Sequence, residues 1–297
     1  MRHKATDITT APEWKYSPLR PAVGLDIGTR GAKGVLLRED EVFTAIIPTG
    51  HHAQATADAL LAVLLGEAGL SRADLGHIVG TGHGRVSLRY EEVAYKVVTE
   101  TSCHAMGAHA ALPGTRTVID IGGQDSRAIK VDPITGKVVE FVVNDKSEAG
   151  TGRFLEKTAT LLGIELEGLG AVAAGAKNPA AVSGQYGVFG ETEVISLRAH
   201  GERDNDPEAR ANIAAGVHYS AARRVNNLVG RIGIVPGLAF TGGVSNNTGM
   251  RGILETLLNA KFQKPKADLI YAGALGAAIY AARAFAQLAA PSTAANL

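Results

Sequence analysis

Two segments of the sequence carry the same short pattern, an apolar run that ends in Asp-Ile-Gly. They are Asp26–Thr29, which reads DIGT, and Asp120–Gly123, which reads DIGG, and each precedes another apolar run that contains Lys or Arg. Glycine lets backbone N–H groups approach a phosphate closely, and a carboxylate at a strand end can hold Mg²⁺ through water. The pattern therefore indicates two phosphate-binding turns, with Asp26 and Asp120 as the expected magnesium-binding residues.

A third glycine-rich turn, TGGVSNN, follows a later apolar run. One such turn alone is more typical of a plain hairpin, but three in this order favour a nucleotide site. Other nucleotide motifs fit poorly, because GTRGAKG lacks the spacing of a P-loop and GTGHGR does not match a dinucleotide fingerprint between a strand and a helix. Phosphate contacts are therefore expected at Gly28, Thr29, Arg30, Gly31, Lys33, Gly122, Gly123, Gln124, Gly242 and Gly243.

Hydrophobic periodicity predicts the elements that must position these turns. The order of strand, glycine turn and strand occurs in both halves, which predicts an α/β protein with two related lobes. Strands are expected within 22–28, 35–40, 41–47, 77–82, 117–132, 136–145 and 238–247, and helices within 55–69, 98–112, 151–164, 191–200, 211–233 and 273–290.

The composition limits the kinds of partner and compartment. The 297 residues carry 30 Lys and Arg against 29 Asp and Glu, so no strong overall field favours nucleic acid or an acidic membrane. The single cysteine, Cys103, allows no internal disulfide, which is typical of a reducing cytoplasm. Residues 1–21 lack the apolar core of a signal peptide and are interpreted as a flexible arm, and no apolar run is long enough to predict a membrane span.

Several ordered motifs together resemble one protein family. GLDIGT, DIGGQD and TGGVSNN are similar in order to the acetate kinase, sugar kinase, Hsp70 and actin superfamily. More narrowly, GTGHGRVSL, TETSCHAMGA, NDKSEAGTGRFLE, VFGETEVISL, FTGGVSNNTGMRGILE and YAGALGAAIYA resemble the BadF/BadG/BcrA/BcrD ATPase family, which includes activators of 2-hydroxyacyl-CoA dehydratases and ATPase subunits of benzoyl-CoA reductase. The resemblance extends from about Ala22 to about Ala286.

The resemblance implies a fold and a division of the chain. It implies two ribonuclease-H-like lobes of the actin and Hsp70 type, with a nucleotide cleft between them. The expected ranges are a flexible arm at 1–21, a first lobe at 22–113, a second lobe with a dimer helix at 114–270, and a C-terminal helix at 271–290 that packs back on the lobes.

The resemblance also implies ATP and Mg²⁺ as ligands. Phosphoryl transfer mostly needs orientation and charge stabilisation, so Gln124, Asp125 and Glu193 are all candidates for positioning the attacking water beside Asp120. The positions that match the family's nucleotide, phosphate and magnesium residues are Asp26, Gly28, Thr29, Lys33, Asp120, Gly122, Gly123, Gln124, Asp125, Gly242, Gly243 and Asn246. Arg30 stands where the family often has a small residue, so the first phosphate turn is expected to differ here.

A [4Fe–4S] cluster, shared between two subunits in this family, is expected to be absent here. The resemblance places Ser147 and Tyr186 at the two positions where family activators have ligand cysteines. Such clusters are held by thiolates, and a serine hydroxyl is a weaker acid and a harder ligand. Cys103 lies on a predicted packed helix and is interpreted as a structural thiol, and His104 on the same helix as a packing or surface residue. Ser147 is interpreted as a local helix cap.

These expectations define one main hypothesis and two alternatives. The chain is interpreted as a cytoplasmic, ATP-hydrolysing subunit that works in a homodimer, or in a heterodimer with a related ATPase subunit, and acts on a reductase or dehydratase. A cluster-free regulatory or assembly ATPase is the first alternative. A small-molecule kinase is the second, and the absence of an evident sugar-binding insertion disfavours it. No contact with nucleic acid or membrane is expected.

Overall fold

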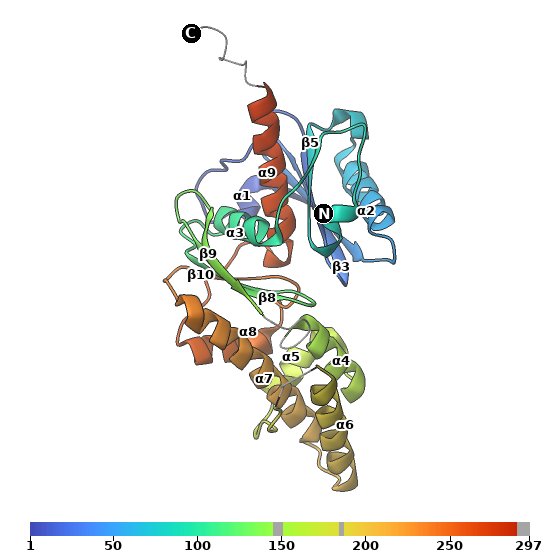
Figure 1. The fold of residues 1–297 in the computed structure, drawn as a ribbon, viewed down its shortest axis with the longest axis vertical. Helices are drawn as coiled ribbons and strands as arrows, with labels where there is room; N and C mark the ends of the chain where they lie inside the picture. The colour runs from blue at the N-terminus through green and yellow to red at the C-terminus, as the bar shows by residue number, and fades with distance from the viewer. Residues whose placement is uncertain (145–150, 184–186, 290–297) are drawn as a thin grey trace. The chain divides into compact units, whose positions relative to one another are not determined.

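The computed structural model describes residues 1–144, 151–183 and 187–289 (Figure 1). The chain divides into two compact units. Unit 1 comprises Met1–Thr115, Asp132–Val138 and Lys264–Leu297, and unit 2 comprises Arg116–Val131 and Val139–Gln263.

Unit 1 contains six strands and four α-helices among its described residues. These are β1 (Arg2–Lys4), α1 (Ala5–Ile8), β2 (Ala22–Ile27), β3 (Gly31–Arg38), β4 (Glu41–Pro48), α2 (Ala53–Ala68), β5 (His77–Thr81), β6 (Tyr95–Val97), α3 (Glu100–Ala111) and α9 (Ala272–Ala289), with 3₁₀ turns at Arg72–Asp74, His83–Ser87 and Leu269–Tyr271.

The sheet of unit 1 has the strand order β1-β4-β3-β2-β5-β6. Strand β2 is antiparallel to β3 and parallel to β5, and every residue of β2 is buried. Because side chains alternate along a strand, Val23, Leu25 and Ile27 enter the core cluster that includes α2. The alternate residues face α9, where Ala22 joins the cluster of α9 residues and Gly24 touches the helix backbone. Asp26 therefore lies on the α9 face of the sheet.

The N-terminal segment differs from the expected flexible arm. Residues Arg2–Lys4 form β1, which pairs antiparallel with β4 and extends the sheet at its edge. The hydroxyl of Thr9 donates to the carbonyl O of Ala110 at 2.6 Å, and Ile8 is buried. Further along, the Trp14 and Tyr16 rings form an edge-to-face pair, and the Arg283 guanidinium lies over the Tyr16 ring. Backbone pairing and apolar burial thus attach this segment to unit 1.

Helix α9 packs unusually close to its neighbours. A side chain on Gly24 of β2 would overlap the backbone of α9, and one on Gly107 of α3 would overlap the carbonyl O of Ala272. Conversely, a side chain on Gly276 of α9 would overlap the carbonyl O of Cys103. Figure 1 shows α9 and α3 adjacent in unit 1. These glycines allow backbone-to-backbone contact, which places the first turn of α9 against the strand end that carries Asp26.

Among the described residues, the segment Leu269–Ala286 is long and apolar enough to cross a membrane, which differs from the expectation of no such span. However, 61% of it is buried inside the structure. Its apolar surface is therefore used by the core of unit 1, as is common for the central helix of a packed domain.

Unit 2 contains a four-stranded sheet with the order β10-β7-β8-β9. Strand β7 is antiparallel to β8 and parallel to β10, which repeats the arrangement of β2 with β3 and β5. In the described residues its elements are β7 (Thr117–Ile121), β8 (Ser126–Val131), β9 (Val138–Val143), α4 (Gly152–Leu162), α5 (Leu166–Ala174), α6 (Gly187–Arg203), α7 (Ala209–Ile232), β10 (Leu238–Thr241) and α8 (Thr248–Leu258).

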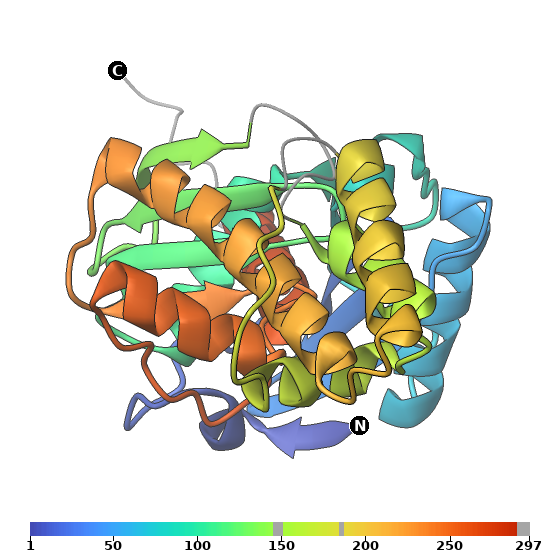
Figure 2. The same ribbon diagram turned by 90° about the horizontal axis from the view of Figure 1, so that it is seen from below.

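The core of unit 2 lies between this sheet and its helices. Figure 2 shows α7 and α8 side by side on one face of the sheet. Buried side chains of β7, α7 and β10, among them Ile119, Val225 and Phe240, form one hydrophobic cluster. The order β4-β3-β2-β5 of unit 1 thus recurs as β9-β8-β7-β10, which confirms the predicted α/β fold of two related lobes.

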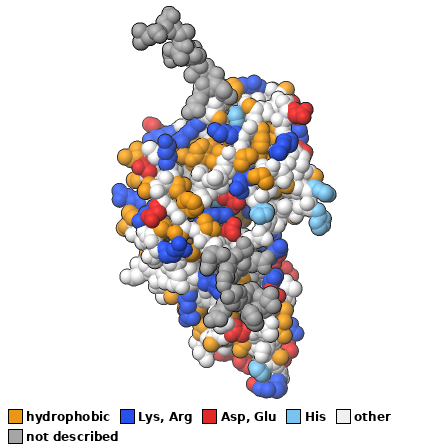
Figure 3. Space-filling view, in the orientation of Figure 1, with side chains coloured by type: hydrophobic (Ala, Val, Ile, Leu, Met, Phe, Trp, Pro, Cys, Tyr) orange, Lys and Arg blue, Asp and Glu red, His pale blue; other side chains and the backbone are white. Residues whose placement is uncertain are grey.

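The surface agrees with the nearly balanced charge of the sequence. On the face shown in Figure 3, cationic and anionic side chains are interspersed over both units. Such mixing gives no large field of a single sign on that face.

The α3–α9 contact makes a direct prediction about stability. Gly107→Ala should lower the free energy of unfolding by about 3 kcal/mol, because the added methyl group overlaps the carbonyl of Ala272. Gly66→Ala is the matched control, since Gly66 is an exposed glycine of α2 with open space around it. It should raise the stability by about 0.5 to 1 kcal/mol. Chemical denaturation measures both, and equal stability of the two variants would contradict the close packing.

Candidate functional site

The first glycine turn of unit 1 connects β2 to β3. A side chain on Gly28 would lie 2.8 Å from the carbonyl O of Gly31 and 3.4 Å from Lys33 Nζ, so the turn closes tightly beside the lysine. Thr49 holds it from the end of β4, because its hydroxyl donates to the Gly28 carbonyl at 2.8 Å and its N–H donates to the Arg30 carbonyl at 2.9 Å. Thr49 therefore fixes the expected phosphate turn by two hydrogen bonds, and the Lys33 ammonium lies next to this turn.

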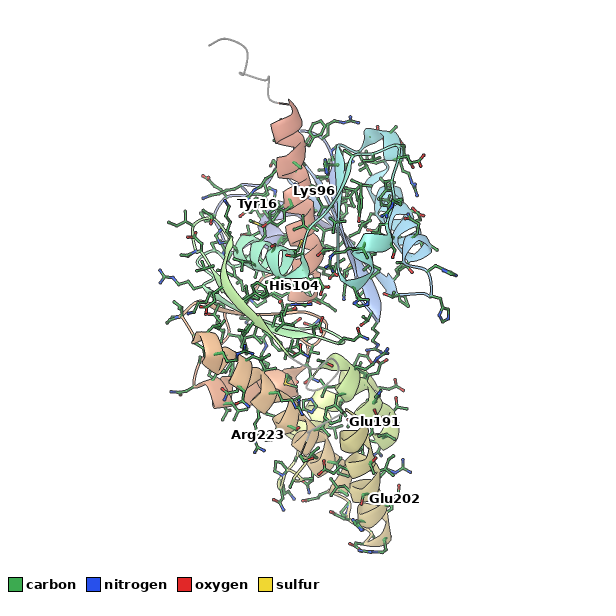
Figure 4. The ribbon with its side chains drawn as sticks, in the orientation of Figure 1. Tyr16, Lys96, His104, Glu191, Glu202 and Arg223 are labelled. Atoms are coloured by element: carbon green, nitrogen blue, oxygen red, sulfur yellow. The ribbon has the colours of Figure 1, made fainter. Side chains whose placement is uncertain are left out.

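Asp26 lies at the end of β2 in a space shaped by two glycines. A side chain on Gly82 would lie 2.5 Å from Asp26 Oδ1, and one on Gly273 would lie 2.8 Å from Asp26 Oδ2. The Gly273 position is also 3.0 Å from Nε2 of His104, which lies on α3 (Figure 4). Asp26 is only 6% exposed. His104 is thus a buried residue that packs near the expected magnesium carboxylate.

The second turn, in unit 2, joins β7 to β8. The Gly122 N–H donates to the Asp125 carbonyl at 2.8 Å, which closes the turn. Arg127 binds both aspartates of this region, with Nη1 2.8 Å from Asp120 Oδ2 and Nη2 3.1 Å from Asp125 Oδ2. Asp120 and Arg127 are both buried, so this ion pair fixes the two carboxylates. Arg127 was not singled out in the sequence, although it is the cation of the second apolar run.

The third turn approaches Asp120 from β10. Gly242 has φ = +90°, and a side chain there would lie 2.5 Å from Asp120 Oδ1. The Thr241 hydroxyl donates to the same oxygen at 3.3 Å. By contrast, Gly243 faces open space. Gly242 therefore allows the close approach, and Gly243 leaves room beside it.

Two polar residues of the TGGVSNN turn follow these glycines. Asn246 is exposed, as expected of a ligand-contacting residue. Ser245 is buried, and its hydroxyl has no hydrogen-bond partner in the described part of the chain. A buried hydroxyl without a partner is costly, so Ser245 is a further candidate for a ligand or water contact that the sequence did not reveal.

The two carboxylates have equivalent surroundings in the two units. Asp26 pairs with Lys33 across the β2–β3 hairpin and with Thr81 on the parallel strand β5. Asp120 pairs in the same way with Arg127 and Thr241. Directly paired residues project from the same face of a sheet, so each unit places a cation and a threonine beside its aspartate.

This repeat assigns a structural meaning to the GTGHGR segment. Gly82 follows Thr81 as Gly242 follows Thr241, and Gly82 also has a positive φ of +83°. Each of the two glycines lies next to the carboxylate of its own unit. The sequence alone did not connect GTGHGR with TGGVSNN, because their equivalence depends on strand pairing.

Helix α4 begins on the second turn. Its first N–H groups, those of Gly152 and Arg153, donate to the carbonyls of Gly122 and Gly123, both at 2.9 Å. The N-cap residue is Thr151, whose side chain makes no capping bond. Backbone carbonyls of the expected phosphate turn thus accept the first N–H groups of α4. Ser147 itself, like Tyr186, lies outside the described residues.

The other flank of that segment is tied to the same turn. Asn144 Oδ1 accepts the Ser126 N–H at 2.8 Å, and the Asn144 N–H donates to the Ser126 carbonyl at 3.0 Å. Asn144 Nδ2 also lies 3.5 Å from the Gln124 carbonyl. The residues on both sides of 145–150 are therefore anchored to the β7–β8 turn.

Glu193 has a different environment from the other candidate catalytic residues. It lies on α6, and its Oε2 accepts the N–H and the hydroxyl of Ser183, both at 2.9 Å. Arg127 joins Asp120 to Asp125, whereas Glu193 holds the segment before α6. A role for Glu193 in positioning water stays a prediction.

The carboxylates suit a partly hydrated Mg²⁺ ion. Among the described residues, no group of three or more His, Cys, Asp or Glu side chains could hold a metal ion. Mg²⁺ commonly uses one or two carboxylates, with water and substrate phosphate completing its shell. Single aspartates beside glycine turns fit that chemistry.

Cys103 does not fit an iron–sulfur cluster. It is fully buried on α3, and burial raises the pKa of its thiol to about 12. A cluster ligand must be a thiolate at an accessible position. The interpretation of Cys103 as a packed structural thiol agrees with this environment.

Comparisons with known proteins identify the relatives of the chain. Residues 23–281 match the profile described as the BadF/BadG/BcrA/BcrD ATPase family. The chain is 39% identical to the 2-hydroxyisocaproyl-CoA dehydratase activator of Clostridioides difficile, covering 87% of this chain and 94% of the relative. It is 32% identical to a benzoyl-CoA reductase subunit of Thauera aromatica, covering 87% and 92% respectively.

A solved structure gives the same relationship at the level of the fold. It is the activator of the 2-hydroxyisocaproyl-CoA dehydratase from Clostridium difficile with bound ADPNP. The TM-score is 0.80 at 37% identity, over 90% of this chain and 96% of that chain.

Gly242 provides a test of the site in unit 2. Gly242→Ala should weaken Mg-ADP binding by roughly tenfold or more, because the methyl group meets Asp120 and the residue has a positive φ. Gly252→Ala on α8 is the control, since its surroundings are open. Isothermal titration calorimetry measures both affinities. Wild-type affinity in a folded Gly242→Ala protein would contradict the assignment.

Proposed function

The chain belongs to the BadF/BadG/BcrA/BcrD ATPase family and is an ATPase, and we propose that it uses ATP hydrolysis to drive a dehydratase or reductase partner. The identity of about two residues in five to a dehydratase activator favours a 2-hydroxyacyl-CoA dehydratase as that partner. The benzoyl-CoA reductase relative supports a reductase as the other candidate.

The observation that carries this proposal is the pair of backbone hydrogen bonds between the β7–β8 turn and the start of α4. Gly122 and Gly123, the expected phosphate-binding residues, accept hydrogen bonds from the first N–H groups of α4. A change in the turn between ATP and ADP would therefore act directly on the start of α4. Such hydrogen bonds couple the hydrolysis of ATP to a movement of α4, and a partner protein can respond to that movement.

The residues of each unit have complementary roles in this proposal. Backbone N–H groups of the three glycine turns bind phosphate, and Lys33 meets its negative charge. Asp26 and Asp120 would hold Mg²⁺ through water, and the ion would supply positive charge to the phosphate oxygens. Gln124 or Asp125 orients the attacking water. Gly243 and Asn246 complete the nucleotide contacts.

The residues of this chain do not fit a [4Fe–4S] cluster of the usual kind. The resemblance places Ser147 and Tyr186 at the positions of the family's ligand cysteines, and Cys103 is buried, so it would not replace them. We therefore assign the redox centre to the partner or to a cysteine-bearing relative in a heterodimer. A homodimer of this chain would act as a cluster-free regulatory or assembly ATPase, and the missing thiolates favour that second candidate.

ATP turnover tests the proposed activity. Asp120→Ala should lower the rate of Mg-ATP hydrolysis by about 10²-fold or more, because it removes the carboxylate beside the phosphate turn. Asp204→Ala is the control, since Asp204 is exposed and forms an ion pair with its exposed neighbour Arg203. Release of phosphate is measured for both variants. Unchanged hydrolysis in Asp120→Ala would reject the site.

Iron content tests the missing cluster. Wild-type protein purified without oxygen should contain no stoichiometric iron, because thiolate ligands are absent at both positions. The double variant Ser147→Cys/Tyr186→Cys should gain iron and the absorption of a [4Fe–4S] cluster as a dimer. Iron analysis and electron paramagnetic resonance measure this, and a cluster in the wild type would contradict the proposal.

A further inference from the structure

His218 is a buried histidine that no part of the proposed mechanism uses. It lies on α7 and is fully buried. Its Nδ1 is 2.7 Å from the carbonyl O of Ala214, one turn earlier on the same helix. Its Nε2 is 3.2 Å from Oδ1 of Asn247, the N-cap residue of α8. The ring therefore joins α7 to the end of the TGGVSNN turn.

Both of these partners are acceptors. A backbone carbonyl can only accept, so the Ala214 contact needs a proton on Nδ1. The Asn247 atom also accepts the Met250 N–H at 2.8 Å, which identifies it as the carbonyl oxygen of the side chain rather than its amide nitrogen. The second contact consequently needs a proton on Nε2. A neutral ring carries one proton, so only the charged ring satisfies both contacts.

Asn247 in turn is connected to the phosphate site through the backbone. Its N–H donates to the Val244 carbonyl at 2.9 Å, and the Val244 N–H donates to the Ile121 carbonyl at 3.2 Å. Ile121 directly follows Asp120. A continuous series of hydrogen bonds thus leads from His218 to the strand end that carries the catalytic carboxylate.

The position of Asn247 is also restricted by packing. A side chain on Gly170 of α5 would overlap Asn247 Oδ1, and one on Gly249 would lie 2.6 Å from the Gly170 carbonyl. The amide of Asn247 is therefore enclosed between α5 and α7, with little space for another rotamer. A change in the hydrogen bond between Asn247 and His218 must therefore shift the backbone of the turn, because the Asn247 side chain cannot change its rotamer.

We propose that His218 is a positioning residue for the nucleotide turn Gly242–Asn247, and that the protonation of its ring sets how firmly this turn is held. The proposal rests on the proposed function, because it assumes that the turn binds nucleotide. With one proton, the ring can serve either Ala214 or Asn247. With two, it serves both, and the turn is fixed in its binding geometry.

The electrostatic surroundings give the direction of the pH effect. Burial lowers the pKa of His218 from the ordinary value of 6.5, while the bonds to Ala214 and Asn247 act to raise it. No charged side chain of the described residues on α5, α7 or α8 contributes to this shift. Because the native pKa is the lower one, the ring's contribution to folding stability is lost as the pH falls below about 6.5. Protonation nevertheless strengthens the hold on Asn247.

As the pH falls, the contribution of His218 to Mg-ADP affinity should therefore rise, while its contribution to folding stability should fall. His218→Phe should weaken Mg-ADP binding by about tenfold, and His218→Gln, which keeps one donor, should weaken it less. The ratio of variant to wild-type dissociation constants should grow as the pH falls below about 6.5, since only the wild-type ring gains a proton there. Calorimetry at saturating Mg²⁺ gives the ratio, and thermal unfolding of the same samples gives the stability.

Asn247→Asp provides a second test that preserves the helix cap. Aspartate is an equally good N-cap residue, and its charge should raise the pKa of His218. The ratio of the Asn247→Asp/His218→Gln dissociation constant to that of Asn247→Asp should then rise at a higher pH than the ratio measured for His218→Gln against the wild type. His200→Gln, an exposed histidine of α6, is the matched control and should leave the ratio at one.

The outcomes distinguish this proposal from the proposed function. If the wild type binds Mg-ADP but the ratio is one, or is above one and independent of pH, His218 is a packing residue and the positioning role is wrong. If the wild type binds no Mg-ADP, both proposals fail. Histidine-labelled NMR of the full chain tests the contact alone: Asn247 amide signals that do not follow the His218 titration would also overturn it.

Discussion

The close approach of backbone to a buried carboxylate is the constraint on which the site depends. Around Asp26 and Asp120 the space is too small for a β-carbon, so the neighbouring positions are Gly82, Gly273 and Gly242. Two of these glycines also have a positive φ, which other residues adopt only with strain. Each carboxylate is thereby held at a strand end with open backbone beside it. A small hydrated cation and phosphate oxygens match this combination of charge and exposed N–H groups.

The two units place different cationic side chains opposite the buried carboxylate. Lys33 lies opposite Asp26 and Arg127 lies opposite Asp120, in the same hairpin register. Arginine can bind two carboxylates at once through its planar guanidinium, and Arg127 does so with Asp120 and Asp125. Lysine offers a compact charge on a flexible chain, which suits a mobile phosphate. Unit 2 thus holds its two carboxylates in fixed positions through Arg127, whereas the Lys33 side chain of unit 1 can adjust its position.

The sequence predicted most of the elements and the glycine turns that follow them, because both are encoded locally. Hydrophobic runs indicated β2, β7 and β10, and glycine placed after aspartate indicated the turns. Arg127, His104 and His218 were missed as partners of the site, since each meets it through strand pairing or helix packing between distant segments. The N-terminal segment was misjudged for the same reason. Its polar composition is typical of an arm, but its backbone completes a sheet edge and Ile8 is buried.

Helices around the second unit's turns have little freedom to move independently of them. The start of α4 is bonded to Gly122 and Gly123, and α8 begins at Asn247, which His218 of α7 holds from the other side. Packed helices shift between discrete arrangements rather than deform gradually. A small change at the phosphate would therefore be passed to α4 and α7 together. Because this link uses backbone atoms and one histidine, it does not require cysteine thiolates.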